Sequence, residues 1–448
     1  MAIDLAKVKS VSPARLAAFD ILRKVEDGAF SSVLLATKDE DLKQVDRALC
    51  HELVLGVLRW QLQLDRIIEH YANRSIDNLD LAVRLALRLG LYQLRFLSRV
   101  PASAAVNESV NLVAHARVRS AQGLVNAVLR RAALEPDYDP AADTRDVIER
   151  IAIETSHPVW LIERWAHTFG LEECRGFAST NNQTPPTAIR VVSARASETD
   201  VLSKLRLAGA TVTASQVTEG AWRVSGAPSL LRDLARAGEV YLQDEASQLV
   251  ARVVGAAPGE RVLDLCAAPG GKTTQMADLA GGRCFVVASD VSRRRLKTVT
   301  ETAASHGLSG IRCLTLDASQ PLPFRDGLFD RVLVDAPCSG TGTLRRNPEI
   351  RYRITAEDIP NLSTRQKQFL FNAASVVKPG GRLIYSTCSV EPEENEEVVE
   401  TFLGMTDRFR QTPVPVNSFL LTQSGSARTW PHLQGTDGFF IAAFERTR

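Results

Sequence analysis

Five short apolar segments in the second half of the chain constrain the fold more than any other feature of the sequence. Each is rich in Val, Leu or Ile, and helix-forming or loop residues separate one from the next. Strands that alternate with helices in this way pair in parallel and build a doubly wound α/β sheet. We therefore predict an α/β domain over 236–448, with "GFFIAAFER" as a late, antiparallel strand. The five segments are "RVLDLC", "CFVVASD", "IRCLTLDA", "RVLVDAP" and "GRLIYSTC".

The rest of the chain divides into a helical part and a mixed part. Over 1–140, amphipathic patterns recur from "SPARLAAFDILRKVED" to "RSAQGLVNAVLRRAA", and no strand pattern interrupts them. The Pro- and Asp-rich stretch "ALEPDYDPAADT" is typical of a linker. Over 145–235, helical "HPVWLIERWAHTFG" is followed by "TAIRVVSAR", which alternates like a strand. The sequence thus predicts a multidomain protein: an all-α N-terminal domain, a small α+β middle module and a C-terminal α/β domain.

Composition excludes several classes of protein. No apolar run approaches the roughly 20 residues of a membrane span, and the start "MAIDLAKVKSVSPARL" lacks the apolar core of a signal peptide. Seven cysteines, an odd number without a CxxC pair, indicate neither a disulfide framework nor a zinc site. We therefore predict a cytoplasmic protein without a membrane partner or a bound metal.

Charge is informative only locally. The net charge is +2, but from Arg59 to Arg131 eleven arginines face five acidic residues. Such a basic helical stretch can neutralise the phosphates of a nucleic acid. A solvated helix surface explains the same charges equally well, so charge alone does not decide between them.

A glycine-bearing turn in "VLDLCAAPGGKTTQMADLA" follows the first of the five strands and precedes a helix. Such a turn lets a ligand approach the backbone, with helix N–H groups directed at a negative group. The dinucleotide fingerprint GxGxxG is absent, and a phosphate-binding P-loop would need glycine where Cys266 stands. The turn therefore predicts a ligand site of another kind.

Three acidic residues follow successive strands of the predicted sheet. Asp290 ends the second strand, where a carboxylate can accept both hydroxyls of a ribose. Asp317 and Asp335 end the third and fourth. A single Asp at a strand end is ordinary turn chemistry. The ordered series favours a cofactor that contains adenosine, bound at the carboxyl edge of the sheet.

Two cysteines follow the fourth and fifth strands. Cys338 stands in "DAPCSG" and Cys388 in "RLIYSTC", so both thiols converge on the predicted pocket if the strands are neighbours. A thiolate that adds to C6 of cytosine makes C5 able to accept an electrophilic methyl group. Loss of the C5 proton and elimination of the thiol then benefit from a second acid/base group. Two buried structural cysteines are the alternative, and a redox pair is disfavoured by the wide separation in sequence.

These motifs resemble those of a known family. "LDLCAAPGGKT", "DAPCSGTG" with "RRNPEIR", and "YSTCSVEPEEN" are similar to the motifs of the Nol/Nop/Sun RNA cytosine-C5 methyltransferases, in the same order. "SHPVWLIERW" and "QDEASQLV" resemble upstream segments of that family, and the helical first part resembles the RNA-binding factor NusB. The combination implies a Rossmann-like methyltransferase domain that acts with S-adenosyl-L-methionine on a cytosine of 16S rRNA.

The resemblance also implies roles for individual residues. Cys388 is implied to be the nucleophile, and Cys338 to assist release of the methylated product. By analogy with DNA cytosine-C5 methyltransferases, the Pro-Cys cysteine Cys338 would attack instead. Lys272 and Asp335 are implied to lie near the target base. The residues implied to hold S-adenosyl-L-methionine are Cys266, Ala267, Ala268, Pro269, Gly270, Gly271, Lys272, Asp290, Asp317 and Asp335.

RNA contacts are predicted in the loop "LRRNPEIRYR", where guanidinium groups can bind phosphates and stack on bases. The four candidates are Arg345, Arg346, Arg351 and Arg353. The acidic stretch Glu391–Leu403 is predicted to begin the next helix. The predicted partner is 16S rRNA, naked or in an early assembly intermediate. The alternatives are tRNA as substrate, or a non-catalytic RNA-binding or ribosome assembly factor.

Overall fold

The computed structural model describes residues 11–38 and 41–447. The chain forms two compact units: residues up to Gln183 together with Leu344–Arg353, and Thr184–Thr343 together with Ile354–Arg448. A short internal segment of the second half of the chain thus belongs to the first unit. The amino-terminal stretch for which we predicted no signal peptide lies largely in 1–10, outside the described residues.

The first unit is helical, as the sequence predicts. One apolar core contains residues of α1 and α3–α7, among them Phe19, Leu53, Leu87 and Leu129. The long amphipathic pattern that begins at Asp46 forms two helices that meet at Trp60. The helices of this unit are α1 (Pro13–Glu26), α2 (Ser31–Lys38), α3 (Gln44–Arg59), α4 (Gln61–Ala72), α5 (Leu81–Phe96), α6 (Ala102–His115), α7 (Gln122–Leu134), α8 (Val147–Thr155), α9 (Val159–Phe169), α10 (Leu171–Thr180) and α16 (Ile350–Arg353), with 3₁₀ turns η1 (Ile76–Asn78) and η2 (Arg119–Ala121).

Some arginines of the basic stretch serve this core rather than the surface. Arg88 is 3% exposed and donates hydrogen bonds to both carboxylate oxygens of Asp65, at 2.7 and 2.8 Å, and to Glu26 at 2.9 Å. A buried guanidinium needs such partners because its desolvation is costly. The number of arginines in this stretch therefore overstates the positive charge that the surface of the helices presents to a partner.

The predicted middle module is shared between the two units. Its helices α8–α10 belong to the first unit, and its strands open the second. There they form an antiparallel sheet of order β2-β3-β1-β4. Two short strands of this sheet, β2 and β4, carry no clear alternation and escaped the sequence pattern. The elements are β1 (Thr187–Val191), α11 (Glu198–Leu207), β2 (Thr211–Ala214), β3 (Ala221–Ser225), α12 (Pro228–Arg236) and β4 (Val240–Leu242).

The main sheet has the order β10-β12-β9-β8-β5-β6-β7, with β11 paired to β12. The five predicted strands, β5–β9, pair in parallel, and β12 runs antiparallel to β9, which confirms both predictions. The chain order turns back at β5, so ligands are expected beyond the carboxyl ends of β5 and its neighbours. The strands are β5 (Arg261–Asp264), β6 (Phe285–Asp290), β7 (Ile311–Thr315), β8 (Phe329–Asp335), β9 (Val377–Thr387), β10 (Phe409–Thr412), β11 (Ala427–Arg428) and β12 (Phe440–Arg446).

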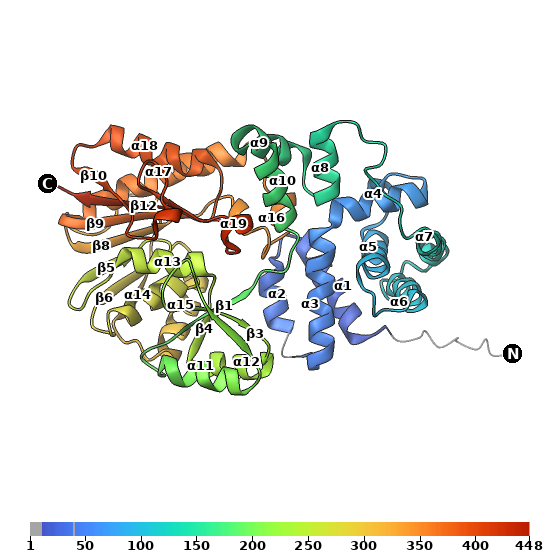
Figure 1. Ribbon diagram of the computed structural model, residues 1–448, viewed down its shortest axis with the longest axis horizontal. Helices are drawn as coiled ribbons and strands as arrows, with labels where there is room; N and C mark the ends of the chain where they lie inside the picture. The colour runs from blue at the N-terminus through green and yellow to red at the C-terminus, as the bar shows by residue number, and fades with distance from the viewer. Residues whose placement is uncertain (1–10, 39–40, 448) are drawn as a thin grey trace. The chain divides into compact units, whose positions relative to one another are not determined.

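Helices cover both faces of this sheet (Figure 1). One face packs against α13 and α14 through residues such as Val250 and Met276. The other packs against α17 and α18 through Phe369 and Phe402. Two apolar layers around a mostly parallel sheet define the doubly wound α/β class. The remaining elements are α13 (Glu245–Val254), α14 (Gly271–Leu279), α15 (Arg293–Ser305), η3 (Thr341–Thr343), α17 (Asp358–Val376), η4 (Pro392–Glu394), α18 (Glu396–Met405), η5 (Ser418–Leu420) and α19 (Pro431–Gln434).

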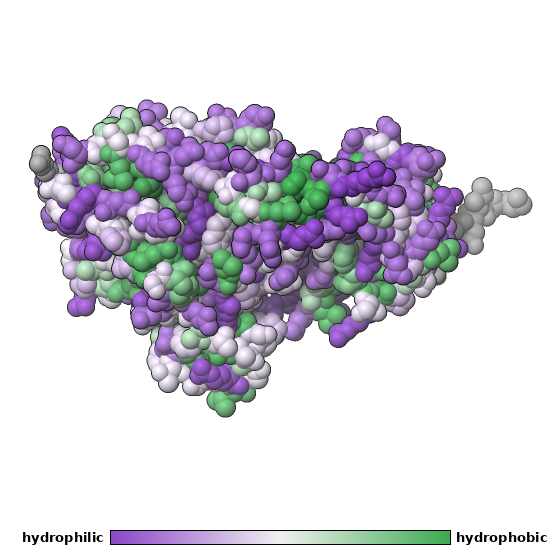
Figure 2. All heavy atoms as spheres, turned by 45° about the horizontal axis from the view of Figure 1, so that its top comes forward, coloured by the Kyte–Doolittle hydropathy of each residue, from purple (hydrophilic) through white to green (hydrophobic). Residues whose placement is uncertain are grey.

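The surface is mixed in polarity. On the face drawn in Figure 2, hydrophobic residues form small patches among hydrophilic ones. Within residues 11–38 and 41–447, no helix has the length and apolar character needed to cross a membrane.

Candidate active site

The predicted cofactor loop and the two cysteines follow strands whose carboxyl ends lie at one edge of the main sheet. Strands β5, β8 and β9 lie side by side, and Asp335 at the end of β8 is paired in register with Ser386 of β9. The loops that carry the two cysteines start directly beyond these strand ends. The topology therefore converts segments far apart in sequence into one site.

A pocket of about 190 Å³ lies at this edge. It is lined by seven of the residues implied by the resemblance: Cys266, Ala267, Ala268, Pro269, Gly271, Lys272 and Asp335. Gly270, Asp290 and Asp317 do not line it. Five further lining residues, which sequence reasoning did not single out, are Tyr241, Leu242, Gln243, Ser247 and Asp264. Two of them, Gln243 and Ser247, belong to "QDEASQLV", a segment that the sequence analysis noted only for its resemblance to the family.

The loop between β5 and α14 is shaped by its glycines. Gly270 has φ +106°, a conformation that side chains disfavour, and a Cβ there would lie 3.1 Å from the Cα of Val299. A Cβ on Gly271, the first residue of α14, would lie 3.0 Å from the ring of Tyr241. The loop is tied to the neighbouring strand by the hydrogen bond from Ala267 N to Ser289 O, 2.8 Å. Larger residues at either glycine would push the loop away from its supports.

The three predicted acids differ in their surroundings. Asp290 is buried at the end of β6, and its Oδ1 accepts hydrogen bonds from Ser292 N at 2.8 Å and Arg295 Nη2 at 2.7 Å. Asp317 is exposed and closes a local turn, accepting hydrogen bonds from the main chain and hydroxyl of Ser319. These bonds lower the pKa of Asp317. Its surroundings are those of a turn residue, so its cofactor role stays a prediction.

Lys272 and Asp335 form an ion pair in the pocket. Lys272 Nζ lies 2.7 Å from Asp335 Oδ2, while Asp335 Oδ1 accepts a hydrogen bond from Ser386 Oγ at 2.7 Å. Burial opposes the charged form of Lys272, but the Asp335 carboxylate outweighs it and raises the pKa of the lysine. Lys272 therefore stays protonated, and its positive charge is paired with the Asp335 carboxylate at the carboxyl edge.

Asp264 is the second carboxyl group of the pocket. Its Oδ2 accepts a hydrogen bond from Thr273 Oγ1 at 2.7 Å, and its buried Oδ1 has no protein partner. Burial raises the pKa of Asp264 to about 7. An unpartnered buried oxygen in a pocket wall suits a ligand that brings a donor or a positive charge.

The two cysteines are in contact. Cys338 Sγ lies 3.3 Å from Cys388 Sγ. The hydrogen bond to Cys388, together with burial, raises the pKa of Cys338 well above its usual range. Cys338 therefore holds its proton and can donate it to the sulfur of Cys388. The pair is positioned for acid/base exchange between two thiols.

The arginine segment lies in the first unit, and part of its prediction is corrected. Arg351 is fully buried, and its guanidinium donates hydrogen bonds to Ser156 O at 3.1 Å and Asn182 Oδ1 at 2.9 Å. Arg345 is only 3% exposed. Buried groups of this kind cannot reach a phosphate, so the RNA contacts predicted for Arg351 and Arg345 are replaced by structural roles.

The other two arginines of this segment are partly exposed. Arg353 donates hydrogen bonds to Val25 O and Ala29 O, at 2.7 and 2.6 Å. The RNA contacts of Arg346 and Arg353 stay predictions. In the described residues, no group of three or more His, Cys, Asp or Glu is arranged to hold a metal ion.

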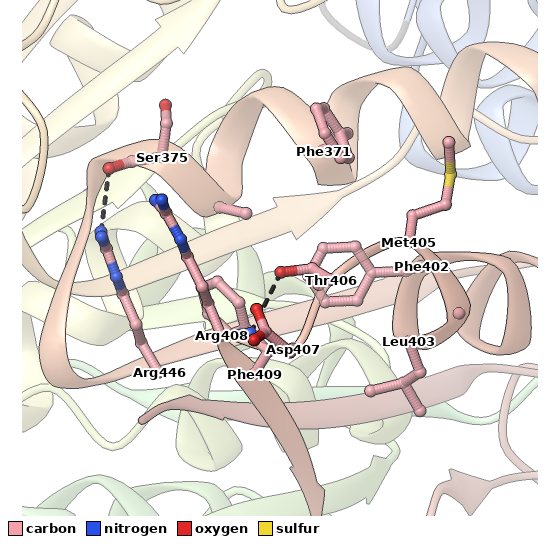
Figure 3. Close-up of a pocket in the computed structure, with 12 residues that line it drawn as sticks. Phe371, Ser375, Phe402, Leu403, Met405, Thr406, Asp407, Arg408, Phe409 and Arg446 are labelled. Carbon is pink, nitrogen blue, oxygen red and sulfur yellow. Dashed lines mark hydrogen bonds between the residues drawn. The ribbon is translucent and has the colours of Figure 1, made fainter. Parts of the chain in front are cut away.

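A larger hollow, about 770 Å³, lies elsewhere on the second unit (Figure 3). Figure 3 shows Phe371, Phe402 and Met405 at its wall, and Arg446 bonded to Ser375 O at 3.1 Å. Arg446 also binds Val377 O, at the start of β9. Because Cys388 follows the other end of that strand, this hollow is remote from the thiols, and size alone does not identify the site.

Three parts of the chain match known protein families. Residues 251–445 match the family described as 16S rRNA methyltransferase RsmB/F, 12–134 match the NusB family, and 157–230 match an RsmF/B-like ferredoxin-like domain. The probable ribosomal RNA small subunit methyltransferase B of Bacillus subtilis (strain 168) is 33% identical over 98% of this chain and 100% of its own. The ribosomal RNA small subunit methyltransferase B of Pseudomonas putida is 36% identical over 96% of this chain and 97% of its own. The chain belongs to the RsmB/F family of ribosomal RNA small subunit methyltransferases.

Solved structures agree with this assignment. The crystal structure of PH0851 is 28% identical, covers 98% of this chain and 99% of its own, and superposes with a TM-score of 0.85. A methyltransferase homologue from Pyrococcus horikoshii is 26% identical over 68% of this chain, with a TM-score of 0.59. The resemblance read from the three motifs and the NusB-like helices is thereby confirmed, as is the predicted fold class.

Family membership makes the chain an S-adenosylmethionine-dependent methyltransferase with an RNA substrate. The pocket fits this cofactor, which carries a sulfonium and an ammonium group. Asp264 offers an unpartnered carboxylate oxygen, and the glycine turn brings backbone close to the ligand. The unpartnered carboxylate oxygen suits a cationic ligand better than a nucleoside phosphate.

Proposed function

We propose that the chain methylates C5 of a cytosine in 16S rRNA, with Cys388 forming a transient covalent bond to C6 and Cys338 assisting product release. The observation that carries the proposal is the 3.3 Å contact between the two sulfurs, on loops that follow the neighbouring strands β8 and β9. S-adenosyl-L-methionine supplies an electrophilic methyl group when it is bound. The chain's own groups then account for activation of the base and for release.

Cys388 is the better nucleophile of the two. Because Cys338 holds its proton, it can donate a hydrogen bond that stabilises a thiolate on Cys388. The thiolate adds to C6 of the cytosine, and the electron pair of the C5–C6 bond becomes available at C5. The Lys272 ammonium, which lies beside Cys388, adds positive charge to the region where the base becomes electron-rich.

Release needs the reverse flow of electrons. After C5 has gained its methyl group, a base removes the C5 proton, the C5–C6 double bond forms again, and the bond between C6 and the Cys388 sulfur breaks. Cys338, in contact with that sulfur, gives its proton to the departing sulfur of Cys388, and the thiolate so formed on Cys338 is the base that takes up the C5 proton.

The natural substrate is proposed to be 16S rRNA in the cytoplasm, naked or in an early assembly intermediate. The target base must leave its stack to reach the partly buried thiol of Cys388. This favours RNA that has not yet been covered by ribosomal proteins. The remaining substrate residues of the proposal are Lys272, Asp335, Arg346 and Arg353.

Two cysteine variants test the mechanism. Cys388→Ala is expected to abolish turnover and to form no covalent RNA adduct, whereas Cys338→Ala accumulates an adduct that survives denaturing electrophoresis. Unmodified 16S rRNA, an early small-subunit precursor and tRNA are each incubated with labelled cofactor. Label on C5 of a cytosine supports the proposal. Adducts with Cys388→Ala but not Cys338→Ala would reverse the roles, and label only in tRNA would replace the substrate.

A further inference from the structure

One buried carboxyl group joins the two cysteine loops. Glu394, the last residue of η4, is fully buried. Its Oε1 accepts hydrogen bonds from Ser339 N and from Gln366 Nε2, both at 2.9 Å. Its Oε2 accepts hydrogen bonds from the hydroxyls of Ser339 and Ser389. Ser339 directly follows Cys338 and Ser389 directly follows Cys388, so one side chain holds the neighbours of both thiols.

The surrounding bonds fix the position of Glu394 itself. Tyr385 Oη, in the end of β9, donates a hydrogen bond to Glu394 O at 2.6 Å. The next residue, Asn395, accepts a hydrogen bond from Thr387 Oγ1 at 2.5 Å and donates one to Ser389 O at 2.9 Å. The turn that carries the carboxyl group is thus bound to the strand that delivers Cys388.

Hydroxyl groups complete the connection between the two loops. Ser339 Oγ lies 2.9 Å from Ser389 Oγ. Thr341 Oγ1 accepts a hydrogen bond from Val390 N at 3.1 Å. Ser389 Oγ accepts one from Glu391 N at 3.0 Å. These contacts add to the connection that the Glu394 carboxylate makes by accepting hydrogen bonds from both serine hydroxyls.

The hydrogen-bond partners of Glu394 are neutral groups. Burial of a carboxyl group among them is costly and raises its pKa, while the bonds from Ser339, Ser389 and Gln366 oppose that shift. A hydrophobic residue at this position would avoid the cost of burial, but it could not accept the hydrogen bonds that join the two cysteine loops.

We propose that Glu394 is a positioning residue that holds the Cys338 and Cys388 thiols at the separation needed for proton exchange between them. The catalytic meaning of this separation rests on the function proposed above. The separation itself does not, and it can be measured without RNA or cofactor.

Thiol proximity is measured by oxidation with hydrogen peroxide. One thiolate attacks a peroxide oxygen, giving a sulfenic acid and releasing hydroxide, and the second thiol then displaces water to form the disulfide. Peptide mass mapping follows the Cys338–Cys388 disulfide among the seven cysteines. In Glu394→Ala the rate of disulfide formation is expected to fall about tenfold. Glu394→Gln, which can keep the bonds because the serine hydroxyls can also accept, is expected to remain within about threefold of wild type.

Glu394→Asp covers the case in which the alanine variant does not fold. Its carboxyl group is one methylene shorter and cannot reach both loops, so an intermediate rate is expected. Glu397→Ala is the matched control, because Glu397 is exposed on the following helix α18. Wild-type disulfide rates in both Glu394→Ala and Glu394→Asp would overturn the proposal.

The catalytic consequence has a separate readout. With 16S rRNA, Glu394→Ala is expected to lower kcat by about 10- to 100-fold, to leave KM for the cofactor unchanged, and to increase the fraction of enzyme held as RNA adduct. Glu394→Gln restores turnover. A general loss of folding would lower kcat without accumulating adduct, and that outcome would contradict positioning. Slower disulfide formation with no wild-type activity on 16S rRNA would instead reject the proposed function and retain Glu394 as the support of both thiols.

Discussion

Arg351 offers the sharpest test of a role that sequence and structure assign differently. The sequence predicts an RNA contact, whereas the structure buries its guanidinium in the first unit. Four acceptors receive its hydrogen bonds: Ser156 O at 3.1 Å, Arg59 O at 3.3 Å, Asn182 Oδ1 at 2.9 Å and Asn181 O at 3.4 Å. Burial lowers the pKa of Arg351 to about 10, so the side chain stays protonated at neutral pH.

The size of the expected effect follows from these bonds. Each hydrogen bond to a charged group contributes about 1.5–3 kcal/mol. The gain is partly offset, since Arg351→Ala also removes the cost of burying the charge. We expect a net loss of about 3–5 kcal/mol, at the upper end of single-substitution effects, because a buried hydrogen-bond network is broken. For a unit of this size that corresponds to a fall in Tm of roughly 6–20 °C.

Calorimetry and RNA binding together separate the two roles. Arg351→Ala is expected to lower the melting transition of the first unit. The fraction that is still folded at low temperature should bind RNA with unchanged affinity. Arg145→Ala, at an exposed position in the same unit, is the control and should change Tm by less than about 1 °C. An unchanged Tm with weaker RNA binding would refute the structural role and restore the original prediction.

Two further predictions concern the pocket. Lys272→Met removes the ammonium 2.7 Å from Asp335 and is expected to lower turnover by a factor of about 10²–10³. Turnover is measured with labelled cofactor, and Lys297→Met, at an exposed position, is the control. Near-normal turnover of Lys272→Met would exclude an electrostatic role. For Asp264, whose pKa is raised to about 7, the folded state keeps a proton that the unfolded state releases between about pH 4 and 7. The contribution of Asp264 to the free energy of unfolding is therefore full at low pH and lost as pH rises through 7. Urea midpoints measured from pH 5 to 8 should decline less steeply in Asp264→Asn than in wild type. An equally steep decline in the variant would contradict the raised pKa.

The sequence was most informative where periodicity and chain order act together. The five parallel strands followed from apolar segments separated by helices, and the contact between the thiols followed from placing Cys338 and Cys388 after strands that proved to be neighbours. Two strands of the small sheet were missed because Thr211–Ala214 and Val240–Leu242 are too short to show alternation. Their pairing is determined by β1 and β3, not by their own pattern.

The acidic stretch after Cys388 shows the limit of local reasoning. Its glutamates were read as the start of a helix, a reading that suits exposed Glu397. Glu394 belongs to a different environment, because its partners Ser339 and Gln366 come from loops and helices distant in sequence. No local pattern distinguishes a glutamate that accepts four hydrogen bonds in the interior from one that faces solvent.

The predicted RNA contacts of Arg345 and Arg351 failed for a related reason, and the position of this segment changes how the helical unit should be tested. The chain leaves the carboxyl edge after Cys338, contributes Leu344–Arg353 to the first unit, and returns at Ile354. In that unit Glu349 accepts a hydrogen bond from Ser31 N at 2.8 Å, and Tyr352 Oη donates one to Leu58 O at 2.8 Å. Deletion of the amino-terminal helices would strip these buried polar groups of their partners, at a cost of about 1–3 kcal/mol each. Loss of activity in such a truncation would therefore report a disturbed Cys338 loop as readily as lost RNA binding, and only surface substitutions on the intact chain separate the two.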